Sequence, residues 1–185
     1  GTTIILLNKV IDGGPIICQE KYKIKPEETY SDLIEKLFLI GANNINKILT
    51  KPSLISNAKP QKEEEATHTK KIEKSDGYID WNQEGNNIIQ IVKALSEKPG
   101  TYSFIDGKKI KIHKVSNYEQ SGIPNDPGQL NVGPNNDLKV STSDGRITIN
   151  ELQLEGKKRM KAEDFIRGYK VYTSINNERI YKKLS

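Results

Sequence analysis

The first fifty residues alternate apolar runs with polar turns, in a pattern that predicts two strands followed by one helix. The β-branched run TTIILL (2–7) indicates a buried strand, and IICQEKYKI (16–24) indicates a second one. Thr29 is a suitable helix cap, and after it apolar side chains recur along one helical face. That face comprises Leu33, Leu37, Phe38, Ala42, Ile45 and Leu49. Two strands and one helix leave a sheet edge uncovered, so we expect this segment to belong to a larger α/β domain.

A polar segment follows, and its composition is typical of a linker. Residues 51–76 contain two prolines and the acidic run Glu63-Glu64-Glu65. We therefore predict three parts: an α/β remnant over 1–50, a linker over 51–76, and a second domain over 77–185.

The second domain is predicted to begin with a helix. After the helix, apolar and polar residues alternate with a period of two, which is typical of strands. In EGNNIIQIVKALSEKPG, residues Ile88, Ile91, Val92 and Leu95 form a helical stripe that Pro99-Gly100 ends. Five short strands follow: TYSFI, KKIKIHKV, GQLNV, DLKVSTS and RITINELQL. Asp-Gly pairs in two of the connections favour hairpins. Short strands joined by glycine-rich turns indicate a small barrel of the OB type, with KAEDFIRGY as a last helix.

Composition limits the classes of protein that fit this pattern. The chain has 185 residues, of which 34% are hydrophobic and 29% charged, enough for one medium or two small domains. No apolar run approaches the roughly 20 residues that span a bilayer, so no membrane association is expected. Cys18 is the single cysteine, which excludes an internal disulfide and fits a small hydrophobic side chain in a strand.

Positive charge is concentrated in the second half of the chain. Residues 1–76 carry 12 Lys+Arg and 11 Asp+Glu, whereas residues 77–185 carry 17 and 13. Within 157–170 the cations are Lys157, Lys158, Arg159, Lys161, Arg167 and Lys170, against Glu163 and Asp164. Such a stretch favours a polyanionic partner, although adjacent charges are also common in solvated loops without one.

Four stretches, in order, resemble the methionyl-tRNA formyltransferase family. They are GTTIILLNKVIDGGPII, EATHTKKIEKSDGYIDW, IIQIVKALSEKPGTYSFIDGKKIKI and STSDGRITINELQLEGKKRMKAEDFIRG. The last one discriminates best, because formyltransferases acting on sugar nucleotides or glycinamide ribotide do not share the run LQ-x-x-GKKRM. The resemblance covers nearly the whole chain.

The resemblance implies a fold and a reaction. The fold is the C-terminal part of a Rossmann-like formyltransferase domain joined to an OB-type β-barrel with flanking helices. The reaction moves a formyl group from 10-formyltetrahydrofolate to the amino group of initiator methionyl-tRNA. We expect a monomer in the cytoplasm of a bacterium or in an organellar matrix.

Asp12 is the candidate catalytic residue. By itself, Asp12-Gly13-Gly14-Pro15 is most simply an ordinary turn; the resemblance makes Asp12 the family's catalytic aspartate and implies that Gly13, Gly14 and Pro15 lie against the folate. A carboxylate in such a loop can orient and stabilise a histidine. The family's asparagine and histidine would precede Gly1, so we expect no formyl transfer from these residues alone.

The resemblance also gives candidate tRNA contacts. Lys157, Lys158 and Arg159 lie in a loop where they can neutralise phosphates, and Lys109 and Lys111 share one strand face that can extend the patch. Lys108 and Lys114 are predicted on the opposite face.

Two alternatives stay open. One is a sugar-nucleotide or other 10-formyltetrahydrofolate-dependent formyltransferase, and the other is a free-standing OB-type RNA-binding module without catalysis. No metal is expected, since His68 and His113 lack the spacing of metal ligands.

Overall fold

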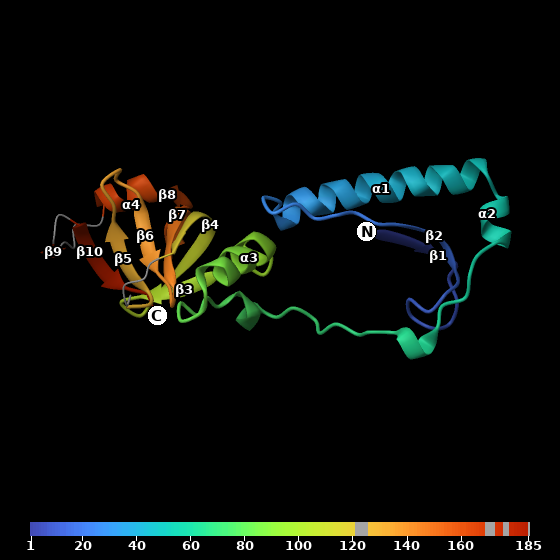
Figure 1. Cartoon of the computed structure of the whole chain (residues 1–185), viewed down its shortest axis with the longest axis horizontal. Helices are drawn as coiled ribbons and strands as arrows, with labels where there is room; N and C mark the ends of the chain where they lie inside the picture. Colours follow the sequence, from blue (N-terminus) through green and yellow to red (C-terminus); the bar gives the residue numbers. More distant parts are fainter. Residues whose placement is uncertain (121–125, 169–172, 176–177, 185) are drawn as a thin grey trace. The chain divides into compact units, whose positions relative to one another are not determined.

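The computed structural model describes residues 1–120, 126–168, 173–175 and 178–184. The chain divides into two compact units, Gly1–Lys71 and Ile72–Ser185. Figure 1 labels their helices and strands.

The first unit is a two-stranded antiparallel sheet packed on a long helix. Its elements are β1 (Thr2–Ile5), β2 (Ile16–Glu20), α1 (Tyr30–Thr50), α2 (Ser53–Ser56) and the 3-10 helix η1 (Glu63–Glu65). An isolated bridge pairs Ile16 with Lys59, which lies beyond α2. The segment predicted as a linker therefore begins with residues that hydrogen-bond back to β2.

Helix α1 begins where the sequence predicts. Thr29 and Asp32 form a reciprocal capping box, in which each side chain bonds the other residue's backbone N–H. The predicted apolar face is only partly correct. Leu33 and Leu37 are half-buried, but Phe38 is 75% exposed and Leu49 is 72% exposed.

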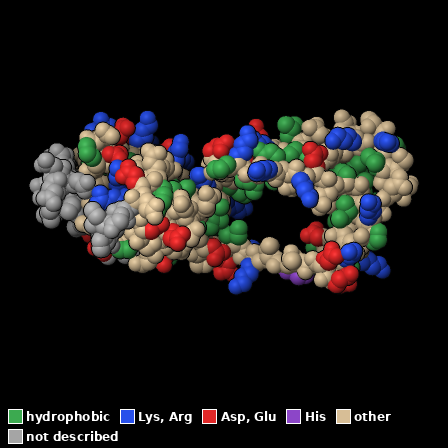
Figure 2. All heavy atoms as spheres, in the orientation of Figure 1, with side chains coloured by type: hydrophobic (Ala, Val, Ile, Leu, Met, Phe, Trp, Pro, Cys, Tyr) green, Lys and Arg blue, Asp and Glu red, His purple; other side chains and the backbone are tan. Residues whose placement is uncertain are grey.

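Apolar side chains surround more of α1 than a two-stranded sheet can cover. The buried residues of α1 are Asn44 and Ile48, and a second apolar side faces solvent within this unit. Figure 2 shows hydrophobic side chains at the surface along this helix.

The second unit is one curled antiparallel sheet with two helices. Its elements are η2 (Lys74–Gly77), α3 (Gly85–Leu95), β3 (Tyr102–Ile105), β4 (Lys108–Gln120), β5 (Gln129–Val132), β6 (Leu138–Ser141), β7 (Gly145–Leu154), β8 (Met160–Lys161), α4 (Ala162–Gly168), β9 (Thr173–Ile175) and β10 (Glu178–Lys183). The strand order is β3-β4-β7-β6-β5-β10-β9, with β8 on β7. Five of these strands match the predicted ones, and β8, β9 and β10 are additional. Tyr169 and Lys170, at the end of the predicted last helix and basic stretch, lie outside the described residues.

The sheet curls into a barrel-like form (Figure 1). Register shifts between the long strands β4 and β7, next to Lys114 and Ser116, bend the pair. A bridge between Ile105 and Leu184 brings the end of β10 to the end of β3, at the opposite side of the strand order. The concave side holds the core, where Ile112, Leu130 and Ile147 are fully buried.

Helix α3 is fastened to the sheet through a glycine and an aspartate. A Cβ on Gly85 would lie 2.6 Å from the Tyr118 ring, so only glycine permits this approach. Asp144 accepts hydrogen bonds from the Gly85 N–H, at 2.9 Å, and from the Tyr118 hydroxyl, at 2.5 Å. This hydrogen bond to Asp144 raises the pKa of Tyr118 to about 12. The first N–H of α3 is thus satisfied by the turn before β7.

Candidate functional site

The loop carrying Asp12 joins β1 to β2 and is closed by its own backbone. The Leu6 N–H donates to the Pro15 carbonyl at 2.9 Å, and the Gly13 N–H donates to the Val10 carbonyl at 3.2 Å. The Asn8 side chain spans the loop, since its Nδ2 donates to the Gly13 carbonyl and its Oδ1 accepts from the Val10 N–H. The loop is therefore a defined structure.

Gln61 holds this loop from outside. Its Nε2 donates to the backbone carbonyls of both Asp12 and Gly14, at 2.7 Å each. Sequence reasoning missed Gln61, because it lies in the predicted linker, 49 residues from Asp12, and no local pattern indicates the contact.

The Asp12 side chain is exposed to solvent. Asp12 has a left-handed φ of 55°, a backbone conformation that Asp adopts more readily than most residues other than glycine. Within the described ranges its carboxylate makes no hydrogen bond or ion pair, and it is flanked by Ile11, which is 92% exposed. An exposed carboxylate on a fixed loop can accept a hydrogen bond from a group that the described residues do not supply.

The two glycines have different surroundings. A Cβ on Gly14 would lie 1.6 Å from the Leu6 carbonyl oxygen, so the closure of the loop itself requires glycine there. At Gly13 a Cβ would meet the Val10 side chain at 2.7 Å. Pro15 is half-buried at the entry to β2, and its carbonyl closes the loop. The predicted folate contacts of these residues stay predictions.

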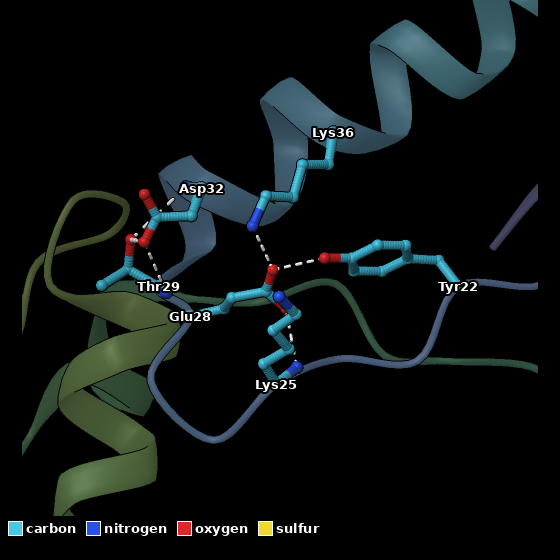
Figure 3. A network of polar contacts seen from close by, with 6 residues as sticks. All are labelled: Tyr22, Lys25, Glu28, Thr29, Asp32 and Lys36. Carbon is cyan, nitrogen blue, oxygen red and sulfur yellow. Dashed lines mark hydrogen bonds and ion pairs between the residues drawn. The ribbon is translucent and has the colours of Figure 1, made fainter.

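A second polar cluster in the first unit is structural. Figure 3 shows Glu28 accepting hydrogen bonds from the Lys25 N–H at 2.7 Å, the Tyr22 hydroxyl and the Lys36 ammonium. The Lys25 N–H, followed by Lys36 and Tyr22, lowers the pKa of Glu28 to about 2. Both carboxylate oxygens of Glu28 accept hydrogen bonds from neighbouring residues, so the cluster fastens residues 22–28 to α1.

In the second unit, Lys109 and Lys111 share an outward face, as predicted. Their neighbours Ile110 and Ile112 are buried in the core, so the two lysines point away from it. Lys111 pairs with Gln153 on β7, and the Lys109 carbonyl accepts from the Glu155 N–H at 3.0 Å. Strand β4 thereby lies beside the start of the basic loop.

Gln153 connects that face to Lys157. Its Nε2 donates to the Lys157 carbonyl at 2.8 Å, and its Oε1 lies 3.3 Å from Nε2 of His113. Burial lowers the pKa of His113, which favours the neutral ring. Because Oε1 can only accept, a hydrogen bond to it requires the ring proton on Nε2. A hollow of about 250 Å³ lies alongside, lined by Lys109, Lys111, Gln153, Leu154, Glu155 and Gly156.

The remaining basic residues are placed less uniformly. Lys157 and Lys158 are exposed in the loop after β7, whereas Arg159 is bonded through Nε to Glu151 at 2.6 Å. Lys114 lines a different hollow, next to Asp137 and Lys161. The structure thus brings Lys109, Lys111 and the 155–159 loop together and leaves Lys114 apart.

No group of three or more His, Cys, Asp or Glu side chains among the described residues is placed to hold a metal ion. No helix in the part of the chain that the structure describes has the length and apolarity to cross a membrane.

A family model described as "Formyl transferase, C-terminal domain" matches residues 71–170, which is more than half of the chain. The chain belongs to this family. The matched residues contain β3, β4, β7 and the basic loop, so the surface around Gln153 lies within the formyl transferase C-terminal domain.

Relatives and solved structures agree with this assignment. Methionyl-tRNA formyltransferase of Syntrophus aciditrophicus is 32% identical over 174 residues, 94% of this chain and 55% of the relative. That of Thermodesulfovibrio yellowstonii is 34% identical over 178 residues, 96% of this chain and 56% of the relative. The chain therefore spans about half the length of these relatives.

A solved structure of HypX from Aquifex aeolicus in complex with tetrahydrofolic acid has a similar fold. It superposes with a TM-score of 0.61 at 16% identity, over 97% of this chain and 33% of that one.

Proposed function

We propose that this chain forms part of an enzyme that transfers a formyl group from 10-formyltetrahydrofolate to the amino group of initiator methionyl-tRNA. One observation carries the proposal: relatives named methionyl-tRNA formyltransferase match 94–96% of the chain, including both the Asp12 loop and the basic surface. The tetrahydrofolic acid in the HypX structure supports a folate-derived formyl donor.

In this proposal the first unit is the end of a Rossmann-like formyltransferase domain. Asp12 orients a histidine and stabilises its positive charge while the histidine takes the proton of the attacking amine. Gly13, Gly14 and Pro15 approach the folate. Support comes from the exposed Asp12 carboxylate and from the hydrogen bonds of Asn8 and Gln61 that fix the loop.

The second unit acts as an OB-type tRNA-binding domain. Lys109, Lys111, Lys157, Lys158 and Arg159 neutralise phosphates and so position the tRNA without reading its sequence. The contact of Gln153 with Lys157 supports this role, because it joins the β4 lysines and the loop cations into one surface. We propose three functional parts, 1–50, 51–76 and 77–185, in a cytoplasmic, monomeric enzyme.

A segment exchange tests the catalytic part. This chain replaces the matching segment of the S. aciditrophicus methionyl-tRNA formyltransferase, and the hybrid is assayed for formylation of initiator methionyl-tRNA. The hybrid is expected to be active, and Asp12→Asn is expected to lower kcat about 10²–10⁴-fold. Glu27→Gln, an exposed acid in the same unit, serves as the control. Full activity of the Asp12→Asn hybrid would remove Asp12 from the mechanism.

A further inference from the structure

Three aromatic side chains gather on the outer face of β3. Ser103 and Ile105 are buried, so the alternation of the strand turns Tyr102 and Phe104 outward, where both are half-buried. Their rings meet edge to face, with centroids 5.8 Å apart. The Tyr78 ring lies 5.8 Å from Tyr102 on its other side and is 42% exposed. The solvent-facing side of a strand usually carries polar side chains, so a row of three partly exposed aromatic rings there indicates a binding surface.

Two lysines lie against this row. Lys109 pairs with Phe104 across β3 and β4, and Lys111 pairs with Tyr102. The Lys109 ammonium lies 3.7 Å from the centroid of the Tyr102 ring, a cation–π contact that holds it at the edge of the aromatic row. Tyr102 thus fixes a positive charge beside partly exposed rings.

The hollow next to these lysines completes the surface. It measures about 250 Å³ and is bounded by Lys109, Lys111, Gln153 and the turn Leu154–Gly156. Its volume is below the range of about 300–1,000 Å³ for whole small-molecule sites. Glu155 is the single acid lining it, so the two ammonium groups leave it with a net positive charge.

Flat rings beside fixed ammonium groups match the chemistry of single-stranded nucleic acid. Bases present π-faces that stack on aromatic side chains, while the backbone presents a phosphate at each step. Base-paired RNA stacks its bases on one another and hides those faces. A protein ligand would not require the two ammonium groups beside the rings.

We propose that Tyr78, Tyr102 and Phe104, together with Lys109 and Lys111, form a site for an unpaired RNA segment. The bases contact the rings, and the phosphates contact the ammonium groups in and beside the hollow. This inference rests on the proposed function, since it names which kind of tRNA segment this face takes.

Fluorescence anisotropy of the full chain tests the site. The probes are a labelled single-stranded RNA of about ten nucleotides, the same strand annealed to its complement, and intact initiator tRNA. Tyr102→Ala and Phe104→Ala are expected to weaken single-strand binding about 5- to 100-fold and to change duplex binding less than about twofold. Lys109→Ala is expected to weaken binding to all three probes.

Conservative variants separate stacking from folding. Phe104→Leu keeps an apolar side chain but removes the ring, so it is expected to lose single-strand affinity, while Tyr102→Phe keeps the ring and retains it. Tyr30→Ala, an exposed tyrosine of α1, is the control. The emission of Trp81, the single tryptophan, reports whether the second unit stays folded.

The outcomes distinguish this inference from the proposed function. If the chain binds tRNA while Phe104→Leu and Tyr102→Ala bind the single strand as the unchanged chain does, the site is overturned and the proposed function stands. If the folded chain binds none of the three probes, both are overturned.

Discussion

Gln153 Nε2 donates a hydrogen bond of 2.8 Å to the backbone carbonyl of Lys157. This contact ties the end of β7 to the loop that carries three of the five basic residues proposed to hold tRNA. The oxygen of the same amide, Oε1, accepts a hydrogen bond from Nε2 of His113 on β4. One neutral side chain therefore links the basic loop to β4, the strand that carries Lys109 and Lys111.

Replacing Gln153 is expected to weaken RNA binding without removing a charge. In Gln153→Ala the loop loses its anchor and must be ordered on binding, so affinity for tRNA should fall a few-fold while its salt dependence is unchanged. Gln90→Ala, an exposed glutamine of α3, is the control. Anisotropy titrations at several salt concentrations measure both quantities; a lowered salt slope would show that Gln153 acts through charge instead.

The buried contact between Trp81 and Ser103 gives a stability prediction. Trp81 is 3% exposed, and its Nε1 donates to the Ser103 hydroxyl at 2.8 Å. Ser103→Ala leaves this donor unsatisfied and should lower the free energy of unfolding of the second unit by about 1–3 kcal/mol. Denaturant titration followed by Trp81 fluorescence reports on this unit, and Ser143→Ala, on an exposed turn, should have no comparable effect.

Two glycines of the first unit should respond oppositely to alanine. Gly14→Ala places a Cβ against the Leu6 carbonyl and should open the loop, so the Leu6 amide would exchange faster. Gly41 lies inside α1 with nothing within 4 Å of a Cβ, so Gly41→Ala should stabilise the helix by about 0.5–1 kcal/mol. Amide hydrogen exchange measures both; equal protection of Leu6 in Gly14→Ala would contradict the described loop.

The Glu28 network predicts an acid-sensitive first unit. Because folding lowers the pKa of Glu28 from 4.5 to about 2, its contribution is fully present above pH 4.5 and is lost as the pH falls toward 2. Glu28→Gln should remove this part of the pH dependence of α1 melting, followed by circular dichroism. Glu35→Gln, an exposed acid on the same helix, should keep it; an NMR titration in which the Glu28 carboxyl has an ordinary pKa would contradict the network.

Local patterns predicted local structure well. The Thr29 cap and the outward direction of Lys109 and Lys111 depend on residues within a few positions, and both are confirmed. The predicted apolar face of α1 is only partly correct, because helical spacing shows which residues are apolar but not how much sheet is present to cover them.

Contacts between distant residues could not be predicted in this way. Gln61 and Gln153 are ordinary polar residues, and folding brings them to Asp12 and His113, which lie 49 and 40 residues away in sequence. The row of three aromatic rings could not be predicted for the same reason. Tyr78 lies far from β3 in sequence and joins it through a parallel bridge to Tyr102.

The salt dependence of tRNA binding tests the central claim most directly. For the full chain and initiator tRNA, the logarithm of the association constant should fall linearly with the logarithm of salt concentration. Removing one phosphate-binding cation, as in Lys109→Ala or Lys157→Ala, should reduce the slope by about one, whereas Lys70→Ala in the exposed segment before the second unit should leave it unchanged. A tRNA affinity that is the same at about 50 and about 200 mM salt, or equal slopes for all three variants, would contradict the claim that this surface holds phosphates.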